Sequence, residues 1–324
     1  MKSKSDKTGS EMEEYEMKFR KICSVFLSAV LLATSVGMAS AAAPTTVQEK
    51  LAAIEKDTYG IEQTGALTDR INKLEKDYNG AHRTGSMMAR VDAVYDQLYK
   101  NGSKPSVLTE INAIEWNIDH EVSMKPVESR VADMEMTFSG KTSEGTYEQR
   151  IKELGRLSFG TETLPIEQTA IPANTLIKVA LVDPVNAQNL KAGDIIRYKV
   201  AQDVIVNDQL VFAKGQPGEG IVKKVKQAKN FGRNAEVEID FYKTKAIDGT
   251  YVDTFLGAES EKEMKNLAMA AGASLAGIVV LGPIGIIGGA FVKGKNVDLP
   301  EGTEFYIQTK SDAVRYGVVT ATAE

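Results

Sequence analysis

The hydrophobic positions between residues 45 and 160 recur with a period of 20 residues. Within each repeat the apolar residues follow one another at steps of four, three and four, which places them on one stripe of an α-helix and does not fit the two-residue period of a strand. The second apolar column of this repeat contains Leu51, Ile71, Val91, Ile111, Val131 and Ile151, which we predict to pack the repeats together. The pattern therefore predicts an array of six short amphipathic helices, each of about 14 residues.

The residues that follow each apolar stripe support this interpretation. A helix ends readily at glycine, because glycine adopts the left-handed conformation without a steric penalty. Glycine follows the last apolar position in five of the six repeats, at Gly60, Gly80, Gly102, Gly140 and Gly160. Pro105 and Pro126 stand at or before a first turn, where the missing N–H of proline has no partner to lose.

Helices this short are marginally stable alone, so their apolar stripes require a partner surface. Stacking on neighbouring repeats would give an elongated structure, a coiled coil would use a second copy, and a membrane would accept the stripes directly. The acidic and mixed polar faces disfavour the membrane. Charged residues also recur beside the stripe, at Glu55, Glu75, Glu115, Glu135, Arg70, Arg90, Arg130 and Arg150. We interpret them as flanking charges and interhelical ion pairs, with a repeated ligand site as the alternative.

From residue 161 the pattern changes to that of strands. Residues 161–174 contain two prolines and predict a linker. The β domain that we expect over 175–324 begins with short runs of β-type residues separated by turns such as Asn207-Asp208 and Asp248-Gly249. These runs occupy 175–182, 195–200, 203–213, 220–227, 235–244, 250–255, 304–309 and 313–319. Eight short strands of this kind predict a small barrel or sandwich, and the whole chain an α+β fold.

An apolar, glycine-rich insertion over 264–292 interrupts these strands, and residues 267–291 carry no charge. A single membrane crossing would separate the last strands from those with which they pair. We therefore predict two short helical arms bent at a Gly-Pro pair, with both ends returning to the β domain. Small residues would let the arms approach a membrane or a partner closely, and the predicted contact residues are Gly272, Ala276, Gly282, Pro283, Gly285 and Gly289. Covering the core of the β domain is the alternative role.

Residues 1–43 predict an N-terminal extension and signal peptide. Basic residues at 18, 20 and 21 precede an apolar run over 22–38, which is followed by the small residues ASAAA over 39–43. This order is that of a secretory signal, and cleavage after Ala41 or Ala43 would also remove Cys23, the single cysteine. An uncleaved membrane anchor is the alternative. We expect an exported protein of the bacterial periplasm, outer membrane or cell surface.

Candidate chemistry adds little to this picture. A net charge of −5 without clusters of one sign disfavours nucleic acid as a partner. His82 and His120 lie in different repeats, outside any metal-spaced cluster, and no motif of a known catalytic or nucleotide site is present. We therefore predict no enzyme, no catalytic, metal or cofactor-binding residue and no cofactor. Trp116 is interpreted as packing, with a ligand platform as the alternative.

Two stretches resemble exported envelope proteins of bacteria. The repeated phrase exemplified by RINKLEKDYNG resembles their tandem helical repeats of about 20 residues. The stretch over 190–222, with the turns Lys191-Ala192-Gly193-Asp194 and Ala213-Lys214-Gly215, resembles a small β domain of such proteins. The resemblance implies an envelope location and no particular activity.

The expected function is that of a non-catalytic envelope protein. Its helical repeats would act as a spacer or assembly arm, through self-association or contact with another envelope protein. Its β domain would contact a membrane or a partner through residues 267–291. Binding of peptidoglycan or another envelope glycan along the repeats is the alternative, and a periplasmic hydrolase with its site in the β domain is a third interpretation.

Overall fold

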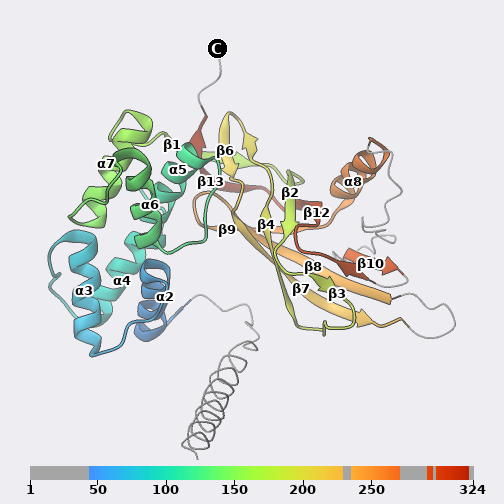
Figure 1. The fold of residues 1–324 in the computed structure, drawn as a ribbon, viewed down its shortest axis with the longest axis horizontal. Helices are drawn as coiled ribbons and strands as arrows, with labels where there is room; N and C mark the ends of the chain where they lie inside the picture. The colour runs from blue at the N-terminus through green and yellow to red at the C-terminus, as the bar shows by residue number, and fades with distance from the viewer. Residues whose placement is uncertain (1–43, 229–234, 271–289, 295–296, 321–324) are drawn as a thin grey trace, which may run out of the picture. The chain divides into compact units, whose positions relative to one another are not determined.

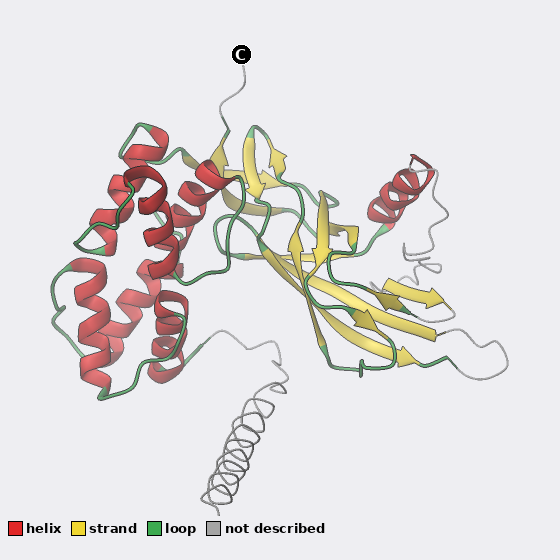
Figure 2. Ribbon diagram, in the orientation of Figure 1, coloured by secondary structure: helices red, strands yellow, loops and turns green. Residues whose placement is uncertain are grey.

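The computed structural model describes residues 44–228, 235–270, 290–294 and 297–320, all within one compact unit, Ala41–Glu324. An array of helices comes first along the chain, and a β region with one further helix follows (Figures 1 and 2). The predicted α+β fold is confirmed.

Six helices of 13 residues each form the array, one in every predicted repeat. They are α2 (Val47–Tyr59), α3 (Leu67–Asn79), α4 (Met87–Tyr99), α5 (Val107–Asp119), α6 (Val127–Ser139) and α7 (Tyr147–Phe159). Four begin at a serine or threonine whose hydroxyl accepts a backbone N–H of the first turn, which compensates for a missing helical partner. The 20-residue period therefore corresponds to one helix and one loop.

Five of these helices end at a residue in the left-handed conformation, which is glycine at four ends and His120 at the fifth. The exception is α4, which ends at Lys100 in an extended conformation. Gly102, which the sequence predicted as the terminator of this helix, lies two residues beyond that point and is not left-handed. The loop after α4 thus differs from the other four.

The repeats pack on one another, one of the three alternatives for burying their stripes, and they form a bundle instead of the elongated stack that this alternative implied. Helix α2 contacts α4 and also α6, and α3 contacts α7. In the last two pairs the partner lies four helices further along the chain. The rings of Tyr78 on α3 and Tyr147 on α7 lie 5.1 Å apart. The second-column residues are at most 3% exposed and belong to one apolar cluster: Leu51, Ile71, Val91, Ile111, Val131 and Ile151. The six stripes share one apolar cluster and so bury more apolar surface than stacking on nearest neighbours alone would allow.

The β region is built on a closed barrel of six antiparallel strands in the order β8-β7-β4-β2-β12-β9, with β9 pairing back to β8. The strands are β2 (Leu176–Leu181), β4 (Ile195–Val200), β7 (Pro217–Lys226), β8 (Ala235–Lys245), β9 (Tyr251–Phe255) and β12 (Glu304–Thr309). Closure depends on the length of β8, because residues 243–245 pair with β9 while residues 235–239 pair with the additional strand β10 (Ala290–Gly294). The barrel interior is filled by apolar side chains, among them the packed rings of Tyr198, Phe241 and Phe305.

A second sheet has the strand order β1-β13-β6-β5. Its strands are β1 (Ile166–Ile171), β5 (Val204–Val206), β6 (Gln209–Phe212) and β13 (Ala313–Val319), and the short pair β3 (Val185–Asn186) and β11 (Asp298–Leu299) forms separately. The linker predicted over 161–174 therefore contains a strand. Its two prolines, Pro165 and Pro172, flank β1, where they remove no hydrogen bond from the interior of the ladder.

The glycine-rich insertion is described only at its ends. Helix α8 (Ala258–Ala270) enters it, and residues 290 and 291, predicted to end a helical arm, instead begin strand β10. The predicted contact residues lie outside the described residues: Gly272, Ala276, Gly282, Pro283, Gly285 and Gly289. Among the helices that the structure describes, none has the length and apolar character needed to cross a bilayer.

Candidate functional site

Four of the five helix–helix junctions contain the same buried ion pair, which we call the Glu–Arg clamp. In each, a glutamate accepts the backbone N–H of the residue eight positions later, at 2.9–3.0 Å, and binds the arginine fifteen positions later, at 2.6–2.7 Å. The pairs are Glu55–Arg70, Glu75–Arg90, Glu115–Arg130 and Glu135–Arg150. The clamp therefore holds both the intervening loop and the next helix. The recurring charges form ion pairs between helices, which confirms the ion-pair interpretation.

The pKa values of two clamp glutamates show how well their charge is compensated. Burial alone would raise the pKa of Glu75, but Arg90 and the N–H of Arg83 hold it below its usual value. The same balance lowers the pKa of Glu135, through Arg150 and Ser143. A buried carboxylate with a lowered pKa is stabilised by its partners.

The junction between α4 and α5 lacks the clamp. Tyr95 stands in the glutamate position and Glu110 in the arginine position. Burial, together with the charge of Glu148, raises the pKa of Glu110 to about 7. This is also the junction at which α4 ends without a left-handed residue. At this one junction the helix end, the following loop and the clamp charges all differ from those of the other repeats.

The altered junction is where the bundle meets the β region. Asn101, in the loop, donates its amide N–H to the carbonyl oxygen of Asp248 at 2.8 Å, and the Thr109 hydroxyl donates to the same oxygen at 2.9 Å. Asn112 donates to the carbonyl oxygen of Ile247 at 2.8 Å and accepts from Arg130 at 2.7 Å. These two carbonyls belong to the Asp248-Gly249 turn that precedes β9. Three polar side chains thus satisfy a buried turn of the barrel.

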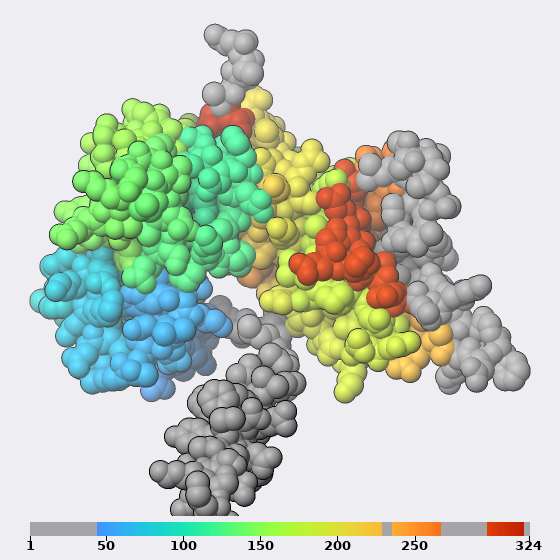
Figure 3. Space-filling view, viewed as in Figure 1, coloured from blue at the N-terminus to red at the C-terminus, as the bar shows by residue number. Residues whose placement is uncertain are grey.

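Helix α5 consequently has two buried faces. Its apolar stripe packs in the bundle, while Thr109, Asn112, Ala113 and Trp116, at helical spacing, face the β region. Trp116 packs against the small apolar cluster between the two parts and donates its indole N–H to an Asp203 carboxylate oxygen at 2.8 Å. The packing interpretation of Trp116 is confirmed. In the space-filling view the green surface of the helices abuts the yellow surface of the strands (Figure 3).

A second contact joins the loop after α5 to the turn before β7. The N–H of Val122 donates to the carbonyl oxygen of Lys214 at 2.8 Å, and Glu121 forms ion pairs with Lys199 and Lys214. Gly215 adopts a φ of +91°, and a β-carbon built on it would lie 2.1 Å from the carbonyl oxygen of Val122. Only glycine allows this approach, because any side chain would push the two backbones apart.

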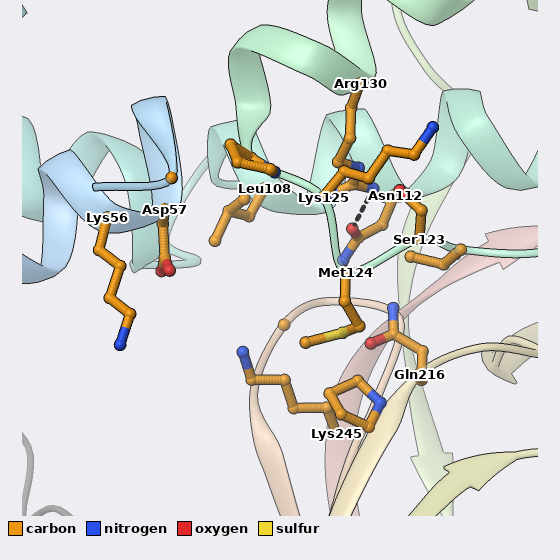
Figure 4. A pocket seen from close by; sticks show the side chains of 15 residues that line it. Lys56, Asp57, Leu108, Asn112, Ser123, Met124, Lys125, Arg130, Gln216 and Lys245 are labelled. Atoms are coloured by element: carbon orange, nitrogen blue, oxygen red, sulfur yellow. Dashed lines mark hydrogen bonds between the residues drawn. The ribbon is translucent and has the colours of Figure 1, made fainter. Parts of the chain in front are cut away.

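A pocket of about 400 Å³ lies between these two contacts (Figure 4). The bundle contributes side chains from α2, α5, α6 and the loop after α5, and the barrel contributes the start of β7 and the end of β8. Its lining residues are Lys56, Asp57, Gly60, Leu108, Asn112, Val122, Ser123, Met124, Lys125, Pro126, Arg130, Gln216, Pro217, Lys245 and Gly249. Because bundle and barrel supply opposite walls, the pocket exists only when the two are docked.

Two polar side chains of the barrel wall stand out. Gln216 is 2% exposed, and its amide nitrogen has no hydrogen-bond partner among the residues that the structure describes. Lys245 is half-buried, and burial lowers the pKa of its amine. Within the described residues no ion pair forms to Lys245, although Asp57 lines the same pocket. Figure 4 shows the amino groups of Lys56 and Lys245 reaching into the open space between helix and strand.

Sequence reasoning did not find this pocket. The predicted packing residues, represented by Leu51 and Ile111, build the bundle core instead of a binding surface. The pocket residues are far apart in the sequence, since Asp57, Met124 and Lys245 come from different parts of the fold. The available signal was the absence of the clamp residues at positions 95 and 110, which marks the docking junction.

Within the described residues, no group of three or more metal-ligating side chains is placed to hold an ion. Neither a protein-family model nor a curated protein matches the chain. Among solved structures, it is similar to ComB10 of the Com type IV secretion system of Helicobacter pylori, with 14% sequence identity and a TM-score of 0.25, over 44% of this chain and 88% of that chain. A TM-score this low supports no argument about fold or function.

Proposed function

We propose that the chain is an exported, non-catalytic binding protein of the bacterial cell envelope, and that it holds an envelope component in the pocket between bundle and barrel. The observation that carries this proposal is the pocket itself. Its volume of about 400 Å³ falls in the range of small-ligand sites, and its walls combine a few polar groups with apolar side chains.

The walls are pre-organised by the contacts around them. Thr109 and Asn112 hold the barrel turn beside Lys245, while Val122 and Gly215 hold the turn that carries Gln216. A ligand therefore meets fixed groups and loses little free energy to ordering the protein. Such rigidity favours binding over the role of a flexible spacer arm.

The envelope location rests on the signal-like segment in residues 1–43 and on the resemblance of the two quoted stretches to exported proteins. Membrane or partner contact through residues 267–291 remains part of this proposal. The residues predicted to make this contact lie within 272–289, outside the described residues. The absence of a catalytic role is likewise proposed, because the hydroxyl of Ser123, which lines the pocket, donates to a Glu115 carboxylate that the Arg130 guanidinium already neutralises.

The sequence offered glycan binding along the repeats as an alternative. We propose one binding site, the pocket, in its place. The recurring glutamates and arginines are engaged with one another in the clamps. A peptidoglycan fragment therefore fits the proposal as an occupant of the pocket rather than as a chain that follows the array.

Two measurements test this function. The first is fractionation of bacteria that express the full chain, in which recovery outside the cytoplasm is expected and retention in the cytosol would contradict export. The second is thermal unfolding of the purified protein with a soluble digest of bacterial envelope. A bound component should raise the unfolding temperature, because it binds only the folded state.

A matched pair of variants locates the binding. Met124 lines the pocket and is 66% exposed, whereas Met136 on α6 is 51% exposed and lies outside the lining. Met124→Trp should abolish the rise in unfolding temperature by filling the pocket, and Met136→Trp should leave it intact. An equal rise in both variants, or none in the unmodified protein, would refute binding in the pocket.

A further inference from the structure

We infer that the pocket selects a carboxylate group, held between the amine of Lys245 and the amide of Gln216, on a small component of the envelope. This inference rests on the proposed function and adds the chemistry of the ligand. It is carried by an amine and a buried amide that have no ion-pair or hydrogen-bond partner in the described part of the chain, and by the balance of charge around them.

The amine of Lys245 is partly buried and has no counter-ion among the described residues. Its side chain is half-buried, and the ring of Tyr251 lies 5.4 Å from its nitrogen. Its strand neighbour Lys243 reaches Glu219 at 3.1 Å, but in the described part of the chain Lys245 has no comparable partner. A partly desolvated amine gains more from a ligand anion than an exposed one, because its own solvation is already weakened.

Gln216 supplies a hydrogen bond in the same wall. It is almost completely buried, and its backbone is fixed by two bonds, from Val200 to its carbonyl and from its N–H to Ala213. The amide nitrogen still lacks a partner among the described groups. A buried donor without an acceptor is costly, so an acceptor atom of a ligand bonded to it would stabilise the fold.

The charges that remain in the pocket favour a singly charged group. Arg130 is bound by Glu115 and Lys125 by Asp133, so neither is available. Lys56 and Lys245 are the lining cations without a described ion pair, and Asp57 offsets one of them. The pocket thus has about one positive charge to neutralise, which suits a carboxylate better than a doubly charged phosphate.

The remaining walls indicate what accompanies the carboxylate. Leu108, Met124, Pro126 and Pro217 line the pocket with apolar surface. A short peptide end or a sugar acid offers compact apolar groups next to its carboxylate, and either fits a volume of about 400 Å³. The shared chemistry is the carboxylate, and the two sources are separated by experiment.

The test is calorimetric titration of the full-length protein with four probes: N-acetyl-alanyl-alanine, the C-terminal amide of the same dipeptide, N-acetylmuramic acid and inorganic phosphate. At least one of the two carboxylic acids should bind. The dipeptide amide should bind about tenfold more weakly than the dipeptide acid if the peptide is the source, since it lacks the charge that Lys245 recognises.

A charge-matched pair of variants assigns the effect. Lys245→Met keeps the aliphatic stem and should weaken binding of the acid about tenfold or more. Lys223→Met removes the same charge from β7 outside the pocket, where the lysine lies 3.4 Å from Asp240, and should leave affinity within about twofold. Circular dichroism and unfolding temperature confirm that each variant is folded.

Binding of the dipeptide acid or of the sugar acid through Lys245 supports the inference and identifies the source. Three results would overturn it: neither acid binds, phosphate binds more tightly than both acids, or Lys245→Met binds as well as the unmodified protein. If any of these occurs while the envelope digest still stabilises the protein and Met124→Trp abolishes that effect, the proposed function stands and only the carboxylate chemistry fails.

Discussion

The four regular junctions of the bundle and the altered junction between α4 and α5 use polar residues for different purposes. In the regular junctions a buried glutamate and arginine satisfy each other and the intervening loop. At the altered junction Tyr95 and Glu110 replace that pair, and the neighbouring Asn101 and Thr109 turn to the backbone of the barrel. A repeat protein can thus create a docking surface by omitting one of its internal clamps.

The difference also separates stability from function. The clamps lie inside the bundle, so their loss should unfold it, whereas the residues of the altered junction hold one wall of the pocket. Variants in the two groups should therefore differ in size and in kind of effect.

The largest effect is expected from Glu115→Ala. It leaves the buried charge of Arg130 without a counter-ion, which should lower the free energy of unfolding by about 3–5 kcal/mol, measured by chemical denaturation. Glu153→Ala removes a carboxylate of the same type from an exposed pair with Arg156 and should cost much less stability. Similar losses in both variants would show that the clamps are not the source of stability.

Gly215→Ala should have the next largest effect, at the contact between bundle and barrel. The new β-carbon meets the Val122 carbonyl at 2.1 Å in addition to the strain of a positive φ, so we expect a loss of about 3 kcal/mol. Gly193→Ala carries only the strain, because its φ is +97° and nothing lies within 4 Å of a β-carbon there. It should cost about 1 kcal/mol. Equal losses would contradict the close approach.

Glu110→Gln tests the charge at the altered junction. The folded pKa of Glu110 is raised to about 7 from a usual 4.5, so the fold becomes more stable as pH falls from about 7 towards 4.5 and bears the full penalty above pH 7. The glutamine variant lacks that penalty and should be more stable at pH 8, by on the order of 2 kcal/mol, and nearly unchanged near pH 4.5. Denaturation at both pH values measures this, and a pH-independent difference would argue against a buried, protonated Glu110.

Thr109→Val should have the smallest effect. It keeps the shape of the side chain and removes a buried hydroxyl that bonds to Asn101, Ser106 and the Asp248 carbonyl. That carbonyl still accepts from Asn101, so a loss of about 1 kcal/mol is expected. Thr137→Val on α6 removes an exposed hydrogen bond within the helix and should change stability by less than about 0.5 kcal/mol. If the two variants lose the same stability, the buried junction gains nothing from Thr109.

The sequence predicted local structure well and tertiary arrangement poorly. Leu51 and its counterparts at each twentieth position define the helices, because helix periodicity is a local property. The strands over 195–200, 304–309 and 313–319 coincide with β4, β12 and β13 for the same reason. Closure of the bundle depends on contacts between helices four apart, and no local pattern encodes them.

The pocket illustrates the same limit. Gln216 follows a turn that the sequence identified, yet that turn is held by Val122 from a distant loop, whose N–H donates to the carbonyl oxygen of Lys214. Lys245 lies one residue beyond the strand predicted over 235–244, and its surroundings form a pocket only when the bundle is docked. Residues whose role comes from two separate parts of the fold have no signature in either part alone.

The most direct test of the composite pocket is calorimetric titration of N-acetyl-alanyl-alanine and N-acetylmuramic acid into Gly215→Ala and Gly193→Ala, at a temperature where circular dichroism shows both variants folded. Separating bundle from barrel should weaken binding of the preferred acid about tenfold or more in Gly215→Ala, while Gly193→Ala binds like the unmodified protein. Equal affinity in the two variants would contradict a site built jointly by bundle and barrel.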